Sequence, residues 1–383
     1  MQYKAHLLLF IFILSLSCKK KEPSHVYNQK KYKDNTALSV TKYAKSFTLV
    51  NRGGYREINV ISAWPNSTKK HKYILVNKDQ SIPEHHKNDI IVRTPINKVV
   101  VMSTTNIPIL EHLNIEHTLV GFPNTKYISS KKTRTLIEKG LVKDLNNDVE
   151  INMELLLNLN PELVIGFSVN GKNSTLNKIE KMGIPVVLDG AWTEQTPLGR
   201  AEWVKFIAAF FNKDLEANIL FNTIENNYLN AKKTALNTKE KPTVLSGSLF
   251  KEVWNMPGGN SFVATYLKDA NTNYVWQQNT STGSLQLNFE DVLNKAENAA
   301  LWIGAGAFKN KKEMLSLHEG YGYFKAFRDN NIYTFTKKIG DKGGILYYEL
   351  GPLRPDLILK DIIKIAHPNV LPNYESYFFK RLN

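Results

Sequence analysis

The sequence contains one cysteine, Cys18, among 383 residues, so the chain cannot form an internal disulfide. Long apolar runs are missing too. The apolar run at residues 7–14 is far shorter than the roughly 20 residues that a membrane-spanning helix requires. This run therefore has the shape of a secretory signal and not of a membrane span.

Motifs of the common enzyme classes are also absent. The chain has no G-x-S-x-G, no H-E-x-x-H and no Walker loop, and Cys18 belongs to the leader. Carboxylates such as Glu349 and Asp356 are present, but nothing in the sequence sets the distance between them. We therefore predict a protein that is not an enzyme and carries no cofactor. A membrane-anchored accessory or hydrolytic lipoprotein is the alternative.

Charge and histidine placement limit the partners. The formal net charge is +15, yet the lysines are scattered and no zinc knuckle, helix-turn-helix or RNA-binding signature occurs, so no nucleic-acid partner is predicted. A basic surface that attracts anionic solutes or lipid head groups is the more modest inference. Of the 9 histidines, those near predicted lobe structure are His112, His117 and His318. Direct metal binding is therefore not predicted.

The amino terminus resembles a bacterial lipoprotein signal at residues 1–18. Lys4 precedes the apolar run, and Cys18 follows small residues where such a signal is cut and lipidated. Ser15 departs from the pattern, because leucine usually stands at that place, and an ordinary signal peptide is the alternative. Residues 19–37 are polar and rich in lysine, which predicts a disordered tether.

The central predicted feature of the chain is a pair of helices at residues 196–236. Thr196 before Pro197 is a helix start signal, and after a break at residues 212–214 apolar residues recur at helical spacing up to Ala235. This second helix, about 22 residues, would be roughly 33 Å long. We predict a rigid strut that joins an N-terminal lobe at residues 38–195 to a C-terminal lobe at residues 237–383.

An internal repeat supports two similar lobes. Residues 151–158 lead to the predicted strand at 163–166, and residues 287–294, of similar sequence, lead to the predicted strand at 301–304. Chance similarity of two helix-to-strand units is the alternative. Each copy lies on its own side of the strut.

Strands alternate with helices on both sides of the strut. The first lobe opens with β-like runs at residues 47–50, 58–61 and 73–76, and the alternating units follow from residue 94. The predicted fold class is α/β, with two lobes of mostly parallel sheets joined by a single long rigid helix. In such sheets ligands bind beyond the carboxyl ends of the strands.

Several short segments occur in a familiar order: residues 98–122, 160–165 and 257–259, then Leu353-Arg354-Pro355-Asp356 with His367-Pro368. Together they resemble the helical-strut class (class III) of periplasmic substrate-binding proteins, which serve ABC importers of ferric siderophores, haem and cobalamin. The resemblance covers about residues 94–382. It implies acidic side chains that dock to a permease, but no residue here matches those positions by motif.

Aromatic and charged residues follow predicted strands and suggest a ligand cleft. Trp192 and Glu194 precede the strut, and the second lobe contributes Trp254, Trp276, Tyr347 and Arg354. Aromatic rings can stack on flat chelates, and an arginine can pair with carboxylate or catecholate oxygens. We predict that these six residues contact the ligand. Lobe core is the alternative for the aromatic ones.

The predicted function is that of a substrate-binding lipoprotein of an ABC importer that captures a metal chelate, most simply an iron–siderophore. Cobalamin or haem binding by the same fold is the alternative. The expected partners are the chelate, an ABC permease and the membrane through a lipid at Cys18, and the protein is expected to be a monomer. The expected location is the bacterial cell envelope, facing the periplasm, with the outer membrane as one choice.

Overall fold

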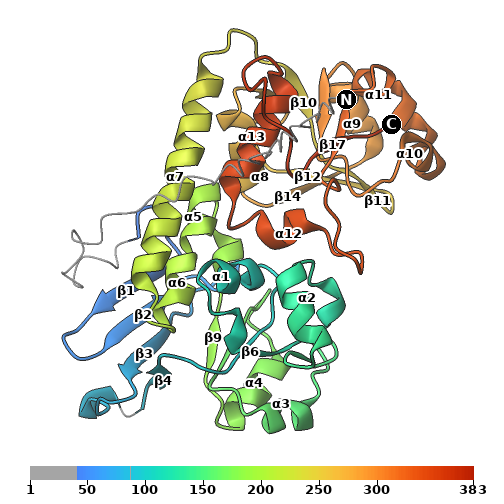
Figure 1. Ribbon diagram of the computed structural model, residues 1–383. Coiled ribbons are helices and arrows are strands. Elements are labelled where there is room, and N and C mark those ends of the chain that lie inside the picture. The colour runs from blue at the N-terminus through green and yellow to red at the C-terminus, as the bar shows by residue number, and fades with distance from the viewer. Residues whose placement is uncertain (1–40, 87) are drawn as a thin grey trace, which may run out of the picture. The chain divides into compact units, whose positions relative to one another are not determined.

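The structure, a computed structural model, describes residues 41–86 and 88–383. The predicted signal peptide with Cys18 and the predicted tether lie outside the described residues. The described part has two α/β lobes and one long helix, which confirms the predicted fold class (Figure 1). Within the described ranges, none of the helices combines the length and the apolar character needed to traverse a bilayer.

A four-stranded leading sheet opens the described chain. Its strands are β1 (Phe47–Asn51), β2 (Arg56–Val60), β3 (His71–Asn77) and β4 (Ile90–Thr94). The first three are antiparallel neighbours, whereas β4 pairs in parallel with β3. The sequence predicts the first three strands and misses β4. The Tyr73 hydroxyl accepts the Leu188 backbone N–H at 3.0 Å, which ties the leading sheet to the N-terminal lobe.

The N-terminal lobe contains a five-stranded parallel sheet in the order β7-β6-β5-β8-β9. These strands are β5 (Val99–Val101), β6 (Leu119–Phe122), β7 (Lys143–Asp144), β8 (Leu163–Gly166) and β9 (Val186–Leu188), and the helices are α1 (Asn106–His112), α2 (Lys131–Glu138), α3 (Met153–Leu159) and α4 (Ser174–Lys181). Every residue of β5, β8 and β9 is buried, as expected for parallel strands covered on both faces. The chain reverses its direction of winding between β5 and β8, so a crevice forms there.

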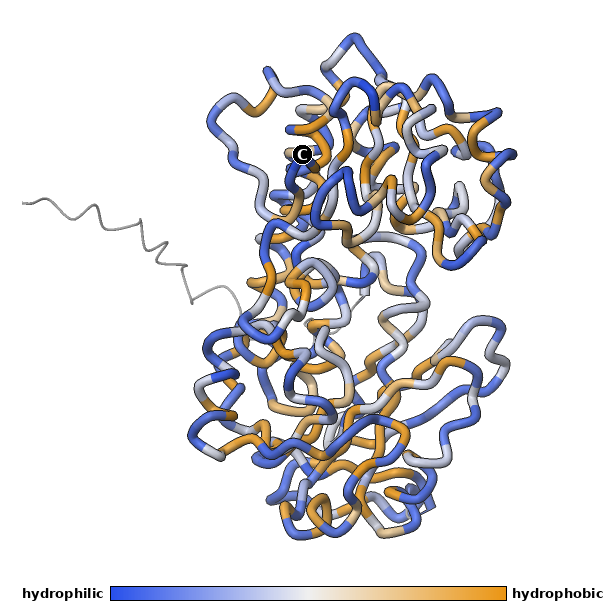
Figure 2. The backbone as a smooth tube through the Cα atoms, turned by 90° about the vertical axis from the view of Figure 1, so that its right-hand side faces the viewer, coloured by the Kyte–Doolittle hydropathy of each residue, from blue (hydrophilic) through white to orange (hydrophobic). Residues whose placement is uncertain are grey.

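The C-terminal lobe repeats this plan. Its main sheet has the order β13-β10-β15-β16-β17, parallel except for β17, and a small antiparallel sheet has the order β11-β12-β14. The strands are β10 (Thr243–Leu245), β11 (Ser248–Phe250), β12 (Val253–Pro257), β13 (Asn273–Tyr274), β14 (Ser284–Leu287), β15 (Leu301–Ile303), β16 (Ile332–Thr334) and β17 (Lys380–Arg381). The helices are α8 (Phe262–Asp269), α9 (Phe289–Ala296), α10 (Lys311–Leu317), α11 (Lys325–Arg328), α12 (Leu346–Leu350) and α13 (Pro355–Ala366). In Figure 2, apolar segments gather inside each lobe and hydrophilic segments run along its periphery.

The repeated sequence occupies equivalent places in the two lobes. One copy forms α3 and β8, and the other forms α9 and β15. Each helix is capped in the same way: Asn152 Oδ1 accepts the Leu155 N–H at 2.9 Å, and Asn288 Oδ1 accepts the Asp291 N–H at 2.7 Å. Both strands lie inside their sheets, β8 between β5 and β9 and β15 between β10 and β16.

The helix that joins the lobes, α7 (Asp214–Leu236), has 23 residues and hence a length of about 34 Å. It follows α5 (Pro197–Glu202), which begins at the predicted cap Thr196, and α6 (Val204–Ala209). Asp214 at its start forms a two-pronged ion pair with Arg56 of the leading sheet, at 2.9 and 2.7 Å. Farther along, the Tyr228 hydroxyl donates to Asp269 of α8 at 2.8 Å. Because these contacts attach α7 to both lobes, it fits the predicted role of a stiff strut.

Candidate functional site

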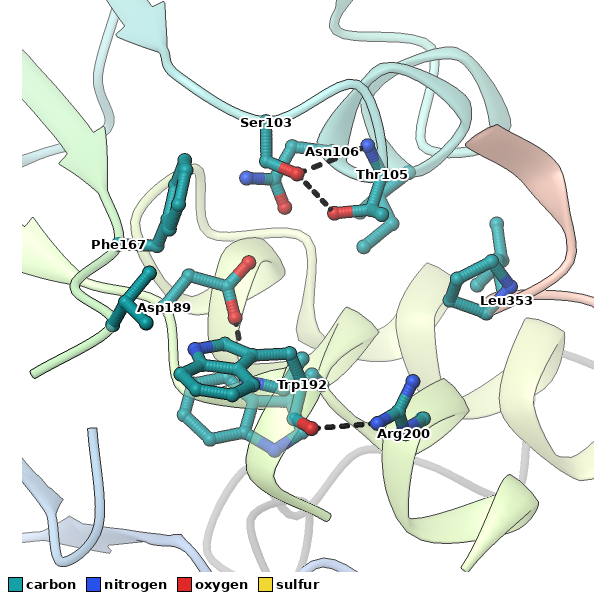
Figure 3. Close-up of a pocket in the computed structure, with 13 residues that line it drawn as sticks. Ser103, Thr105, Asn106, Phe167, Asp189, Trp192, Arg200 and Leu353 are labelled. Atoms are coloured by element: carbon teal, nitrogen blue, oxygen red, sulfur yellow. Dashed lines mark hydrogen bonds between the residues drawn. The ribbon is translucent and has the colours of Figure 1, made fainter. Parts of the chain in front are cut away.

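A cavity of about 300 Å³ opens at the carboxyl ends of β5, β8 and β9 (Figure 3). The N-terminal lobe contributes residues that follow these strands, together with Arg200 of α5, and the loop between α12 and α13 contributes Pro352 and Leu353. We name it the inner cavity. Because residues of both lobes line it, a molecule bound there would contact both lobes at once.

Polar groups are few in the inner cavity and are held in place. The hydroxyls of Ser103 and Thr105 hydrogen-bond each other at 2.8 Å. Asp189 Oδ1 accepts the Ala191 backbone N–H at 2.8 Å, and its carboxylate turns toward the amide of Asn106 (Figure 3). Asp189 is 6% exposed, and burial raises the pKa of its carboxyl, although the hydrogen bond from Ala191 and the nearby amide of Asn106 counteract this.

Arg200 lies where the inner cavity meets a second one. Its guanidinium donates to the Trp192 carbonyl at 2.6 Å and the Glu194 carbonyl at 3.1 Å, and it stacks 3.5 Å from the ring centre of Phe262 in the C-terminal lobe. Burial lowers the pKa of Arg200 to about 10. The side chain therefore links the lobes and presents a buried positive charge to both cavities.

The second, outer cavity has a volume of about 530 Å³ and is also lined by both lobes. Ser62, Pro65, Asn66 and residues 192–195 form its N-terminal side, and residues 255–257, 261–263 and 282–284 form its C-terminal side. Trp192 and Arg200 line both cavities. The two cavities thus meet at these two side chains, and their volumes are in the range of small-molecule sites. We refer to the two cavities together as the cleft.

A buried carboxylate also joins the two lobes. Glu349 of α12 is 1% exposed, and its carboxylate accepts the backbone N–H groups of Ser129 at 2.6 Å and Ser130 at 3.1 Å in the N-terminal lobe. Burial raises the pKa of Glu349, and the nearby Glu111 acts in the same direction, against the hydrogen bonds from the two serines. We refer to this contact as the lobe clasp.

The structure places two predicted ligand residues at the cleft. Trp192, in the short 3-10 helix η6 (Ala191–Thr193), lines both cavities, and Glu194 lines the outer one. The Glu194 carboxylate, however, accepts the backbone N–H groups of Lys45 at 2.9 Å and Ser46 at 2.8 Å and the Trp203 indole N–H at 3.1 Å. It therefore anchors the start of the described chain. Ligand contact by either residue stays a prediction.

For Trp254 and Trp276, the structure corrects the prediction of ligand contact. Trp254 is 0% exposed, stacks on Trp302 at 5.2 Å and donates its indole N–H to the Ser246 carbonyl at 3.1 Å. Trp276 is 7% exposed and packs beside Tyr274. Both belong to the core of the C-terminal lobe. Trp254 lies within strand β12 and not after a strand, and alternation along that strand turns its side chain inward.

Tyr347 and Arg354 do not belong to the lining of either cavity. The ring of Tyr347 stacks on Phe335 at 5.0 Å. The Arg354 guanidinium makes two 2.8 Å hydrogen bonds to Asp356, which is 0% exposed at the start of α13. Asp356 needs this countercharge because it is buried. The bidentate pairing predicted for Arg354 thus exists, but with a carboxylate of the protein.

Sequence reasoning missed Asn106, Asp189, Arg200 and Phe262. Asp189 follows β9, so the rule that ligands bind beyond strand ends could have found it. Arg200 and Phe262 carry no such signal, because only packing of α5 against the other lobe brings them together. Within residues 41–86 and 88–383, no group of three or more His, Cys, Asp and Glu side chains is placed to hold a metal ion.

Comparisons with known proteins identify a family and a shared fold. A family model described as periplasmic binding protein matches residues 99–339, more than half of the chain. An uncharacterized lipoprotein of Methanocaldococcus jannaschii is 25% identical, over 98% of this chain and 95% of its own length.

Two solved structures share the fold. A possible iron-binding (periplasmic solute-binding) protein from Staphylococcus epidermidis aligns with a TM-score of 0.57 at 19% identity, over 72% of this chain and all (100%) of that one. A periplasmic heme-binding protein of Vibrio cholerae aligns with a TM-score of 0.54 at 17% identity, over 69% of this chain and 99% of that one.

Proposed function

We propose that this chain, which belongs to the periplasmic binding protein family and has the two-lobed, helical-strut fold of class III, captures a metal chelate in the cleft between its lobes and delivers it to the permease of an ABC importer. Proteins of this family bind solutes and are not enzymes. The chelate that we propose first is a ferric siderophore, with cobalamin and haem as the alternatives.

The observation that carries the proposal is the shared lining of the cleft. Both cavities draw residues from both lobes, and they meet at Trp192 and Arg200. Aromatic rings with a few fixed polar groups are typical of small-molecule sites, and a buried arginine suits an acidic or strongly polar group on the ligand. The iron-binding and heme-binding descriptions of the two solved structures also favour a chelate.

The geometry of α7 supports capture with little domain motion. The helix is attached to the leading sheet at Asp214 and to the C-terminal lobe at Tyr228, so bending it would break contacts at both places. Loss of the ligand would then need only the separation of the lobe clasp and of Arg200 from Phe262. We propose that the protein acts as a monomer, because one chain supplies both sides of the cleft.

Anchoring at a membrane belongs to the same proposal. Two relatives are named lipoproteins, and Cys18 occupies the place where a lipoprotein signal would be cut and lipidated. We propose that a lipid on Cys18 holds the protein at the cell envelope, with the two lobes facing the extracytoplasmic space. Labelling of intact cells with a radioactive fatty acid tests this, since a Cys18→Ala variant should lose the label.

Ligand capture is tested by titrating the purified protein with ferric ferrioxamine E, cyanocobalamin and haemin while tryptophan fluorescence and the melting temperature are recorded. One chelate should raise the melting temperature and quench the fluorescence without being converted. A Trp192→Phe variant should lose part of the quenching, whereas Trp64→Phe, outside both cleft cavities, should keep it. Absence of any response to all three chelates would count against the proposal.

A further inference from the structure

Three buried polar atoms of residues that line the inner cavity lack a hydrogen-bond partner among the described residues. Asn106 is 1% exposed, and neither Nδ2 nor Oδ1 of its amide has a hydrogen-bond partner among the described residues. The indole Nε1 of Trp192 is buried and, within the described ranges, likewise lacks an acceptor. Both residues line the inner cavity, as does the carboxylate of Asp189.

Such a cluster is unusual for the interior of a protein. The large majority of buried side-chain polar atoms have a hydrogen-bond partner, and leaving one without a partner is costly. The amide of Asn106 lies near enough to Asp189 to counteract the rise in the pKa of that carboxyl, yet the two groups form no hydrogen bond of ordinary geometry in the described structure. The cluster is therefore prepared for a group that comes from outside the chain.

The unpartnered atoms of Asn106 and Trp192 determine which hydrogen-bonding functions this group must carry. The Trp192 indole and the Asn106 amide nitrogen need an acceptor, and the Asn106 oxygen needs a donor. Asp189 already accepts the Ala191 N–H, and its carboxylate can accept a further donor. We infer that the inner cavity binds a neutral group with both functions, an amide, from the periphery of the chelate. This inference rests on the proposed function and narrows its substrate class to chelates that carry amides.

Shape and charge favour an amide over an acidic group at this place. An amide is flat, and the rings of Phe167 and Trp203 form walls of the cavity. A carboxylate or catecholate inserted there would approach the carboxylate of Asp189, and like charges repel strongly where water is excluded. An acidic group on the same ligand would instead lie near Arg200, where the two cavities meet.

A requirement for an amide distinguishes between the candidate chelates. Ferrioxamine E and cyanocobalamin carry amides on their periphery, whereas haemin carries two carboxylates and no amide. The cavity should therefore accept one of the first two and reject haemin.

Isothermal titration with these three probes tests the inference on the wild type and on two variants. Asp189→Ala should weaken binding of the amide-bearing probe by about tenfold to a hundredfold, because a buried donor of the ligand then lacks its acceptor. Trp192→Phe removes the indole N–H and keeps an aromatic ring, and it should weaken binding by about tenfold. Asp291→Asn, on the exposed face of α9, and Trp64→Phe are the matched controls and should bind as the wild type does.

A third variant, Asp189→Asn, keeps the size of the side chain and removes its charge. It should weaken the amide-bearing probe less than Asp189→Ala does and should improve any residual binding of haemin. Melting curves identify a variant that has not folded, and the isosteric Asp189→Asn keeps the test decisive if Asp189→Ala fails to fold.

The outcomes separate this inference from the proposed function. If haemin binds the wild type most tightly, the protein is a chelate carrier but the inner cavity does not select amides. Equal affinity of the wild type, Asp189→Ala and Trp192→Phe for an amide-bearing probe would also overturn the inference alone. If none of the three probes binds the wild type, the proposed function fails, and the inference fails with it.

Discussion

Replacing Glu202 by glutamine should loosen the leading segment, residues 42–46, from the N-terminal lobe. Glu202 is 0% exposed in α5, and its carboxylate accepts the backbone N–H groups of Lys42 at 2.8 Å, Tyr43 at 2.7 Å and Ala44 at 2.9 Å. It also accepts the Lys205 ammonium at 2.6 Å. One buried carboxylate thus collects four donors, and together with Glu194 it fixes the whole leading segment.

The size of the effect follows from what glutamine can replace. Its oxygen can keep Tyr43, Ala44 and also Lys42, whose backbone N–H lies 2.9 Å from the same carboxylate oxygen, but its NH₂ group would face the Lys205 ammonium. Losing the charge-assisted hydrogen bond from Lys205 and placing two donors against each other should lower the free energy of unfolding by about 3 kcal/mol. With an unfolding entropy of about 2.1 cal/mol/K per residue over roughly 340 residues, this corresponds to a fall of about 4 °C in the melting temperature.

Two measurements check this prediction. Calorimetry should show the lower melting temperature for Glu202→Gln, and hydrogen exchange should show faster exchange of the amides of Lys42, Tyr43 and Ala44. Glu290→Gln, on the exposed face of α9, is the matched control and should melt as the wild type does. A melting temperature within about 1 °C of the wild type, with unchanged exchange of the three amides, would refute the reasoning.

The remaining predictions concern the core, the strut, the clasp and the inner cavity. Trp254→Ala should lower the free energy of unfolding by about 3–5 kcal/mol, because it opens a cavity in the lobe core, yet calorimetric titration should find chelate affinity within about twofold of the wild type. If α7 is stiff, closure of the lobes by about 5° moves the far end of this helix by only about 3 Å over its length of about 34 Å. Small-angle scattering should therefore show almost no compaction on ligand addition. A large compaction would contradict the role of α7 as a strut. Glu349→Ala leaves the two N–H groups of the lobe clasp without their acceptor and should speed their hydrogen exchange, whereas amides inside β8 should be unaffected. Burial raises the pKa of Asp189 above its ordinary 3.8, so the folded protein binds the proton more tightly than the unfolded chain does. The contribution of this group to stability therefore falls as the pH rises above 3.8. The melting temperature of Asp189→Asn should gain on that of the wild type as the pH is raised from there, and parallel pH profiles would count against this.

Local patterns determined most of the fold. The helical spacing after residue 212 places the strut at nearly the observed bounds of α7, because a long amphipathic pattern depends on its own residues. The repeat at residues 151–166 and 287–304 places α3 with β8 and α9 with β15 at equivalent positions, since each unit carries its own asparagine cap. The missed strand β4 has the same length as β1 and β2 and contains four β-branched residues, so its sequence did carry a strand signal.

The site depended on packing between segments far apart in the chain. Trp254 and Trp192 are both tryptophans beside predicted strand ends, yet one is core and the other lines the cleft, because the alternation of β12 and the position of η6 turn them in opposite senses. The guanidinium of Arg354 pairs with Asp356 of the same lobe. The arginine that reaches the cleft is Arg200, which lies on α5. The sequence by itself thus determined two α/β halves and a rod between them, since helix and strand patterns are local. Tertiary structure alone decided which side chains meet at the cleft, since that depends on how one half packs against the other.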